Sequence, residues 1–213
     1  DQLTRRARRA LVLVMLITGT HLYFRFIREH SELAPTEGGI VTEGLIGKPM
    51  MLSPVFLMGN PVDRDIAELL FSGLTRYNPH TGQIEDDLAT SEKSKDNLTY
   101  TFTILPDALW HDGKPVTADD VIFTYRNVIQ NPIFENVALR QAFADVKIEK
   151  IGPRIVQFHL SSPYSFFLTN VTVGILPRHI LDQVPVENLR QSDFHQNPIG
   201  SGPYQFAAWN VVN

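Results

Sequence analysis

Prolines and glycines are frequent in this chain and favour many turns and short elements. Fourteen prolines and thirteen glycines occur among its 213 residues, and proline both fixes φ and removes a backbone donor. This frequency stays below that of a disordered chain, and 43% of the residues are hydrophobic. The composition therefore predicts one or two globular domains, built from short elements and many turns around a hydrophobic core.

The first 30 residues form a segment of different character. Four arginines precede an apolar run of 11 to 15 residues that starts at Ala10, an order typical of a signal peptide or signal anchor. Because no small-residue cleavage site follows, we expect residues 1–30 to be an uncleaved anchor that contacts the membrane through residues 10–27. A polar linker is expected over 31–39. Arginines stay on the cytoplasmic side, so the rest of the chain would lie in the cell envelope, on the periplasmic or extracellular face. The alternative is a buried helix of a soluble domain.

The charge distribution excludes several classes of function. Residues 1–30 hold six arginines and two acids, so a chain of net charge −4 carries −8 on its remaining residues. Nucleic-acid binding needs clustered lysine and arginine, so no nucleic-acid partner is expected. The chain has no cysteine, which excludes disulfides, thiolate metal sites, cysteine nucleophiles and a lipidated cysteine.

Local signals place the main elements. Asn60 and Pro61 predict a helix start, an apolar stripe follows, and Gly73 suits a left-handed cap at its end. Residues 98–104 alternate between apolar side chains and threonine, which predicts a half-buried strand. Residues 40–46 are expected to form a first strand. Thr117 and Asp120 have the spacing of a capping box, which predicts a helix through residue 128. A hairpin is expected over residues 146–160 and a short helix over 176–182, so the fold class is mixed α+β.

Residues that suggest chemistry have structural interpretations. Ser201 lies in Gly-Ser-Gly and lacks the G-x-S-x-G pattern of a hydrolase nucleophile, so a turn with close backbone approach is expected. The seven histidines show no metal-binding spacing, and His111 is expected to be a surface or hinge residue. Asp119 and Asp120 are expected to cap a helix. Residues 86–87, both aspartates, are expected to be solvated turn residues. We expect no catalytic residue, no metal and no cofactor.

Several stretches together resemble the family 5 extracellular solute-binding proteins, the periplasmic peptide- and nickel-binding class. They occur in the order of that family: IAELLFSGL at 66–74, YNPHTGQIEDDLA at 77–89, WHDGKPVTADDV at 110–121, LPRHI at 176–180 and PIGSGPY at 198–204. Ser72 stands where the family usually has Glu.

The resemblance implies a bilobed fold of the type II periplasmic binding protein kind, with a discontinuous first domain. The first lobe would comprise residues 40–75 and 191–213, and a small second domain would comprise residues 76–190. A third domain that closes over the ligand would be missing. We therefore expect the chain to be a fragment of a longer protein.

The resemblance also implies a function: extracytoplasmic substrate capture for an ABC importer, most often of peptides, with the permease as partner and no enzymatic activity. Nickel chelates, haem and sugars stay open as ligands. The residues expected near the ligand are Phe56, Leu57, Met58, Ser72, Gly73, Ser201 and Gly202. The alternative is a membrane-tethered envelope protein, derived from such a receptor, with a structural or regulatory role.

Overall fold

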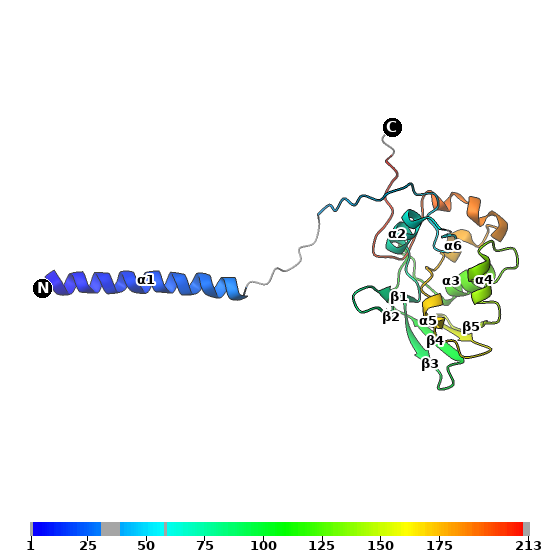
Figure 1. The fold of residues 1–213 in the computed structure, drawn as a ribbon, viewed down its shortest axis with the longest axis horizontal. Coiled ribbons are helices and arrows are strands. Elements are labelled where there is room, and N and C mark those ends of the chain that lie inside the picture. The colour runs from blue at the N-terminus through cyan, green and yellow to red at the C-terminus, as the bar shows by residue number, and fades with distance from the viewer. Residues whose placement is uncertain (1, 31–38, 58, 211–213) are drawn as a thin grey trace. The chain divides into compact units, whose positions relative to one another are not determined.

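The computed structural model describes residues 2–30, 39–57 and 59–210 of the chain. The chain divides into two compact units, Asp1–Gly44 and Leu45–Asn213, whose helices and strands are drawn in Figure 1. The expected linker over 31–39 lies outside the described residues, apart from residue 39.

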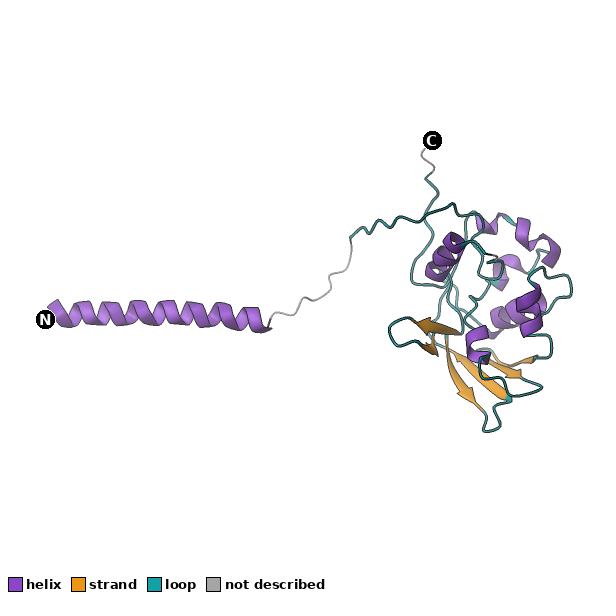
Figure 2. Cartoon of the chain, viewed as in Figure 1, coloured by secondary structure: helices purple, strands orange, loops and turns teal. Residues whose placement is uncertain are grey.

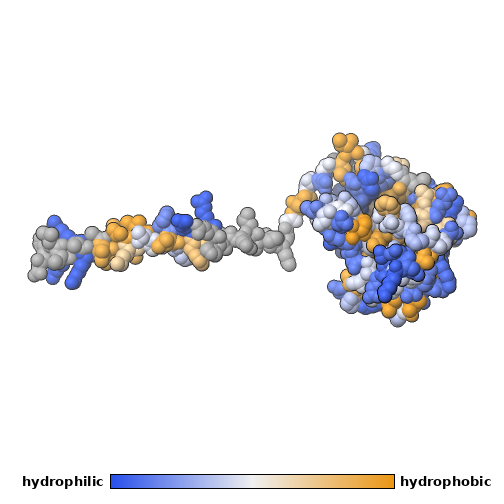
Figure 3. Space-filling model, turned by 60° about the horizontal axis from the view of Figure 1, so that its bottom comes forward, coloured by the Kyte–Doolittle hydropathy of each residue, from blue (hydrophilic) through white to orange (hydrophobic). Residues whose placement is uncertain are grey.

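Helix α1 (Gln2–His30) makes up most of the first unit. Hydrophobic residues gather in the middle of α1 with hydrophilic residues on either side (Figure 3). Thr18 and Thr20 follow this stretch, and their hydroxyls donate to the carbonyls one turn earlier, at 2.8 and 2.5 Å. Within the described residues, no helix is both long and apolar enough to cross a membrane. The anchor expected through residues 10–27 is therefore not supported, since polar side chains break up the apolar run.

The second unit contains two antiparallel sheets with helices packed beside them (Figure 2). Strands β1 (Thr75–Asn78) and β2 (Gln83–Asp86) form a two-stranded sheet. The larger sheet has the order β3-β4-β6-β5. Its strands are β3 (Ala89–Lys93), β4 (Thr99–Ile104), β5 (Lys147–Gly152) and β6 (Ile155–His159). The expected strand over 98–104 and the expected hairpin are both confirmed, and so is the mixed α+β class.

One face of the larger sheet is buried and the other is polar. Tyr100 and Phe102 of β4 are buried, whereas their neighbours Thr101 and Thr103 lie on the opposite face, as a two-residue period requires. The ring of Phe158 in β6 lies 5.3 Å from that of Tyr125, a residue of the helix that covers this face. Burying each such ring contributes about 1.5–3 kcal/mol, so this contact joins helix and sheet into one core.

Helix α2 (Pro61–Leu70) begins as expected and ends earlier than expected. The side chain of Asn60 accepts a hydrogen bond from the Val62 amide at 3.1 Å, and Pro61 is the first helical residue. The helix ends at Leu70, and Phe71 is already extended. The prediction that Gly73 caps the helix in a left-handed conformation is therefore wrong. This glycine is required instead by close backbone packing, described below.

Helix α3 (Ala118–Ile122) opens with the expected capping box and continues into η1 (Phe123–Ile129), a π-helical turn. Thr124 stabilises this transition, because its buried hydroxyl donates to the Asp120 carbonyl and accepts from the Leu176 amide, at 2.8 and 2.9 Å. The remaining helices are α4 (Val137–Ala142), α5 (Phe167–Asn170), α6 (Arg178–Leu181), η2 (Val186–Gln191) and η3 (Asp193–His195). Helix α6 confirms the helix expected over 176–182.

The expected first strand over 40–46 does not form. These residues are irregular, and Ile40 and Ile46 are almost fully exposed, at 96% and 100%. A strand needs a partner for its amides and carbonyls, and none of the described strands pairs with this segment.

Candidate functional site

Three segments that are distant in the sequence form hydrogen bonds with the last residue of α2 and the residues after it. The Ser72 carbonyl accepts from the Ile175 amide at 3.0 Å, and the Gly73 carbonyl accepts from the Leu88 amide at 3.1 Å. The Leu70 carbonyl accepts from the Gly202 amide at 2.9 Å. We call this region, residues 69–74 with their bonded partners in 87–88, 171–175 and 200–204, the α2 junction.

Glycines allow the backbones of the α2 junction to approach one another. A Cβ added to Gly200 would lie 1.7 Å from the Leu70 carbonyl oxygen, and one added to Gly202 would lie 2.6 Å from that of Leu69. At Gly73 it would lie 2.5 Å from the Thr172 carbonyl oxygen. No side chain fits at these distances, so the Gly-Ser-Gly pattern is explained by the close approach that the sequence predicted.

Four of the seven candidate ligand residues come together at the α2 junction: Ser72, Gly73, Ser201 and Gly202. Phe56 and Leu57 take no part in the hydrogen bonds that define it. The ring of Phe56 is buried, 5.4 Å from that of Phe134 and 6.1 Å from that of His195, and Leu57 packs against the hydrophobic core. Met58 lies outside the described residues.

The polar groups of Ser201 form no hydrogen bond with the described residues, and one of them, the hydroxyl, is buried. Its Oγ is buried and has no hydrogen-bond partner, and neither its amide nor its carbonyl bonds to any described residue. A buried hydroxyl without a partner is costly, so such a group is a candidate contact for a bound molecule.

Asp87 is a junction residue that sequence reasoning missed. Burial raises the pKa of its carboxyl group, and hydrogen bonds from the Ser72 side chain and the Gly73 amide, together with the charge of Arg76, oppose that rise. Asp87 is thus a partly buried carboxylate beside two candidate ligand residues, and its prediction as a solvated turn residue is wrong. Its neighbour Asp86 accepts from the Ser91 hydroxyl at 2.6 Å. The sequence offers no local signal for Asp87, because its surroundings come from the end of α2.

His111 joins the turn after Trp110 to the α2 junction. Its Nδ1 accepts from the Gly200 amide at 3.2 Å, and its Nε2 lies 2.9 Å from the Gly202 carbonyl oxygen. Because an amide can only donate and a carbonyl can only accept, we assign the neutral tautomer with the proton on Nε2. His111 is half-buried between two segments, where the sequence had suggested a surface or hinge residue.

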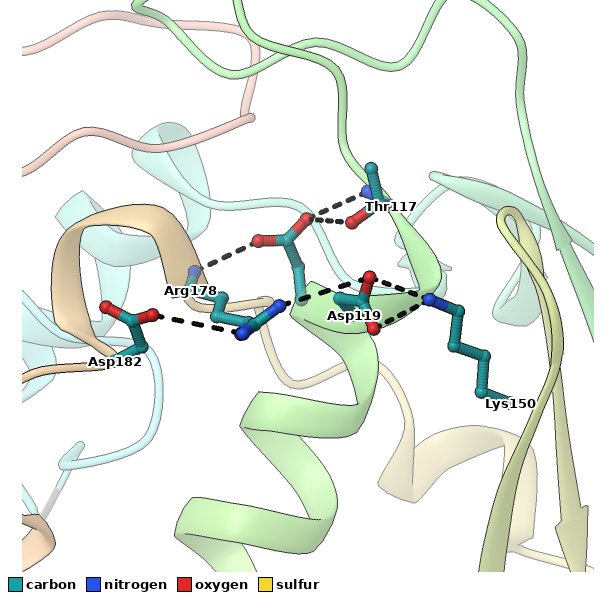
Figure 4. Close-up of polar contacts among 6 residues, drawn as sticks. Thr117, Asp119, Lys150, Arg178 and Asp182 are labelled. Carbon is teal, nitrogen blue, oxygen red and sulfur yellow. Dashed lines mark hydrogen bonds and ion pairs between the residues drawn. The ribbon is translucent and has the colours of Figure 1, made fainter.

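The paired aspartates at the start of α3 are structural. Asp120 is buried, and its carboxylate accepts from the Thr117 amide and hydroxyl, both at 2.8 Å, and from the Arg178 amide at 3.0 Å. Asp119 lies at the surface, where Lys150 bonds to its carboxylate at 2.8 Å (Figure 4). The capping interpretation is confirmed for Asp120, whereas Asp119 lies in the first turn of the helix and pairs with Lys150.

Two further features bear on ligands. Residues 48–52, 190–193 and 195–196, together with Trp209, line a groove of about 570 Å3. None of the seven candidate residues is among them. Its rim includes Met50, which is 82% exposed.

As for metals, no three His, Asp or Glu side chains in the described parts of the chain lie close enough together to hold an ion.

The mixed α/β fold of this chain matches solved structures of periplasmic binding proteins. The structure of NikZ from Campylobacter jejuni in complex with Ni(L-His) matches 77% of this chain and 32% of its own, with a TM-score of 0.66 and 37% identity. The structure of the oligopeptide-binding protein AppA from Bacillus subtilis in complex with a nonapeptide matches 78% of this chain and 33% of its own, with a TM-score of 0.68 and 31% identity.

The sequence comparisons agree with the fold. The chain is 34% identical to the Bacillus subtilis oligopeptide-binding protein AppA over 82% of its own length and 32% of that protein. The model of the bacterial extracellular solute-binding proteins, family 5 Middle, matches residues 83–212. The chain therefore belongs to the family 5 solute-binding proteins, and it spans about a third of the length of the relatives that it matches.

Proposed function

We propose that this chain is part of the substrate-capture component of an ABC importer, that it acts outside the cytoplasmic membrane, and that its ligands are peptides. The observation that carries the proposal is the similarity to an oligopeptide-binding protein over 82% of the chain. Residues 40–75 and 191–213 belong to one lobe and residues 76–190 to a second domain. The protein closes around its ligand as a hinged pair of lobes and delivers it to the permease. It catalyses no reaction.

The α2 junction supplies part of the ligand surface in this proposal. Ser201 offers an amide, a carbonyl and a hydroxyl that bond to no described residue, and a peptide in extended conformation presents complementary backbone groups. Ser72, Gly73 and Gly202 belong to the same junction, whereas Phe56 and Leu57 pack into the core. Backbone pairing of this kind gives affinity without selecting a side-chain sequence, which suits a receptor of many peptides.

Nickel chelates are the competing ligand class, because NikZ was solved with Ni(L-His). No specific feature of the described residues favours the tethered structural role considered from the sequence, so only the receptor is proposed.

The test is ligand-dependent thermal stability of the longest reading frame that contains this chain. A ligand that binds only the folded state stabilises it by about 2.7 kcal/mol at a hundredfold excess over Kd. We expect the melting temperature to rise with short peptides and not with Ni(L-His) or simple sugars. A rise with Ni(L-His) or sugars alone would overturn the peptide assignment, and no rise with any of the three would overturn the receptor itself.

A further inference from the structure

The two glycines on either side of Ser201 are held in place by hydrogen bonds. Residues 200 and 202 each offer one amide and one carbonyl, and all four groups are bonded. His111 makes three of the bonds: its amide donates to the Gly200 carbonyl at 2.8 Å, and its ring bonds to the Gly200 amide and the Gly202 carbonyl. The Gly202 amide donates to Leu70. Ser201 alone keeps its polar groups free.

The turn that carries His111 is itself held in place. The Gly113 amide donates to the Trp110 carbonyl at 2.8 Å, and Gly113 has a φ of +82°, which favours glycine. Trp110 is buried. The Asp112 carboxylate accepts from the Lys114 amide at 3.2 Å and lies 2.8 Å from the His179 ring in α6. The imidazole therefore extends from a turn that is braced on both sides.

We propose that His111 is a positioning residue for the solute site: as a neutral imidazole with its proton on Nε2, it clamps residues 200 and 202 and so holds the free peptide group of Ser201 in place for the ligand. The ligand part of this proposal rests on the proposed function, whereas the clamp does not. His111 acts through Ser201 and needs no contact with the ligand.

The protonation state of His111 decides whether the clamp forms. A second proton would turn Nδ1 from an acceptor into a donor that faces the Gly200 amide, and two donors repel. The clamp therefore requires the neutral ring, with Nδ1 as the acceptor and Nε2 as the donor. The other charged and titratable groups around this turn are Asp112, Lys114 and His179.

The clamp is tested on the full chain by hydrogen exchange and by nitrogen NMR of the imidazole. We expect Nε2 to carry the proton at neutral pH. His111→Ala should reduce the protection of the Gly200 amide about tenfold, the loss of roughly one hydrogen bond. The Gly82 amide, bonded to Asn78 within a remote hairpin, should keep its protection. A proton on Nδ1, or unchanged protection of Gly200, would overturn the clamp.

Two further variants keep the test decisive if His111→Ala folds poorly. His111→Gln keeps a donor near the Nε2 position for the Gly202 carbonyl and lacks the Nδ1 acceptor, so the Gly200 amide should lose protection. The Gly202 amide should keep its protection, because it donates to the Leu70 carbonyl. His80→Ala removes an exposed histidine and should change neither amide. His179→Ala should leave the Gly200 amide protected. A loss of Gly200 protection in His179→Ala as large as that in His111→Ala would assign the effect to the Asp112–His179 pair and overturn the role of His111.

The effect of the clamp on ligand affinity is measured with whichever peptide stabilises the longest reading frame that contains this chain. His111→Ala should weaken the binding of that peptide about tenfold, and His80→Ala should bind it as the wild type does. Unchanged affinity in His111→Ala, with the clamp shown by exchange, would overturn the positioning role. If no peptide binds the wild type, the proposed function fails, and the exchange data still decide the clamp.

Discussion

Gly200→Ala tests whether the α2 junction holds the second unit together. The added Cβ would lie 1.7 Å from the Leu70 carbonyl oxygen, whereas Cβ atoms keep at least 3.0 Å from such neighbours. The backbones must therefore move apart, which endangers the bond from Gly202 to Leu70 and the two ring bonds of His111. At about 1 kcal/mol for each hydrogen bond, the loss of two or all three of these bonds amounts to about 2–3 kcal/mol of unfolding free energy.

The assay is urea unfolding followed by tryptophan fluorescence, with the midpoint and slope fitted separately. A lower midpoint at constant slope would report a less stable native state. The matched control is Gly152→Ala, because a Cβ there meets only the Ile155 side chain at 3.9 Å and should cost less than about 0.5 kcal/mol. The reasoning is refuted if Gly200→Ala unfolds within about 0.5 kcal/mol of the wild type, or if the control is equally destabilised.

Two pairs of substitutions test the burial of Asp120 and of Asp87, each compared with its neighbour in the sequence. Asp120→Ala leaves three donors without their acceptor and should cost about 2–4 kcal/mol in urea unfolding, whereas Asp119→Ala removes an exposed ion pair and should cost less than about 1 kcal/mol. Asp87→Asn tests the sign of a pKa shift: because burial raises the pKa of this carboxyl in the folded state, its favourable contribution is present below the ordinary pKa of 3.8 and is lost as the pH rises through the raised value. Asp87→Asn should therefore be more stable than the wild type at neutral pH and lose that advantage in acid, as followed by thermal unfolding across pH. Asp86→Asn should show no such gain, and equal stability profiles for both variants would contradict the burial of Asp87.

Sequence reasoning succeeded where the deciding partner lies within a few residues. Asn60 accepts from an amide two residues later, and Thr117 and Asp120 are three residues apart. The alternation along β4 depends only on a two-residue period. In each case the pattern and its physical cause occupy the same short window, so the pattern predicts the element.

The failures depend on partners far away along the chain. Gly73 was predicted to end a helix, and the requirement for glycine comes from Thr172. The segment over 40–46 has the side chains of a strand, but no described strand pairs with it. The bonds of His111 reach 89 to 91 residues ahead, a separation at which no local spacing carries information.

The Gly-Ser-Gly stretch at residues 200–202 contains two glycines that packing explains and a serine that packing does not explain. Its two glycines are explained by packing, since the carbonyl oxygens of Leu69 and Leu70 occupy the space that their side chains would need. Packing does not explain the serine, because its hydroxyl is buried without a partner. A residue that only joined two glycines could be alanine at no cost in hydrogen bonds. The glycines and His111 therefore account for the position of the segment. The polar groups of Ser201 are the part of the motif for which the described residues supply no hydrogen-bond partner, and the proposed contact with a solute would give them one.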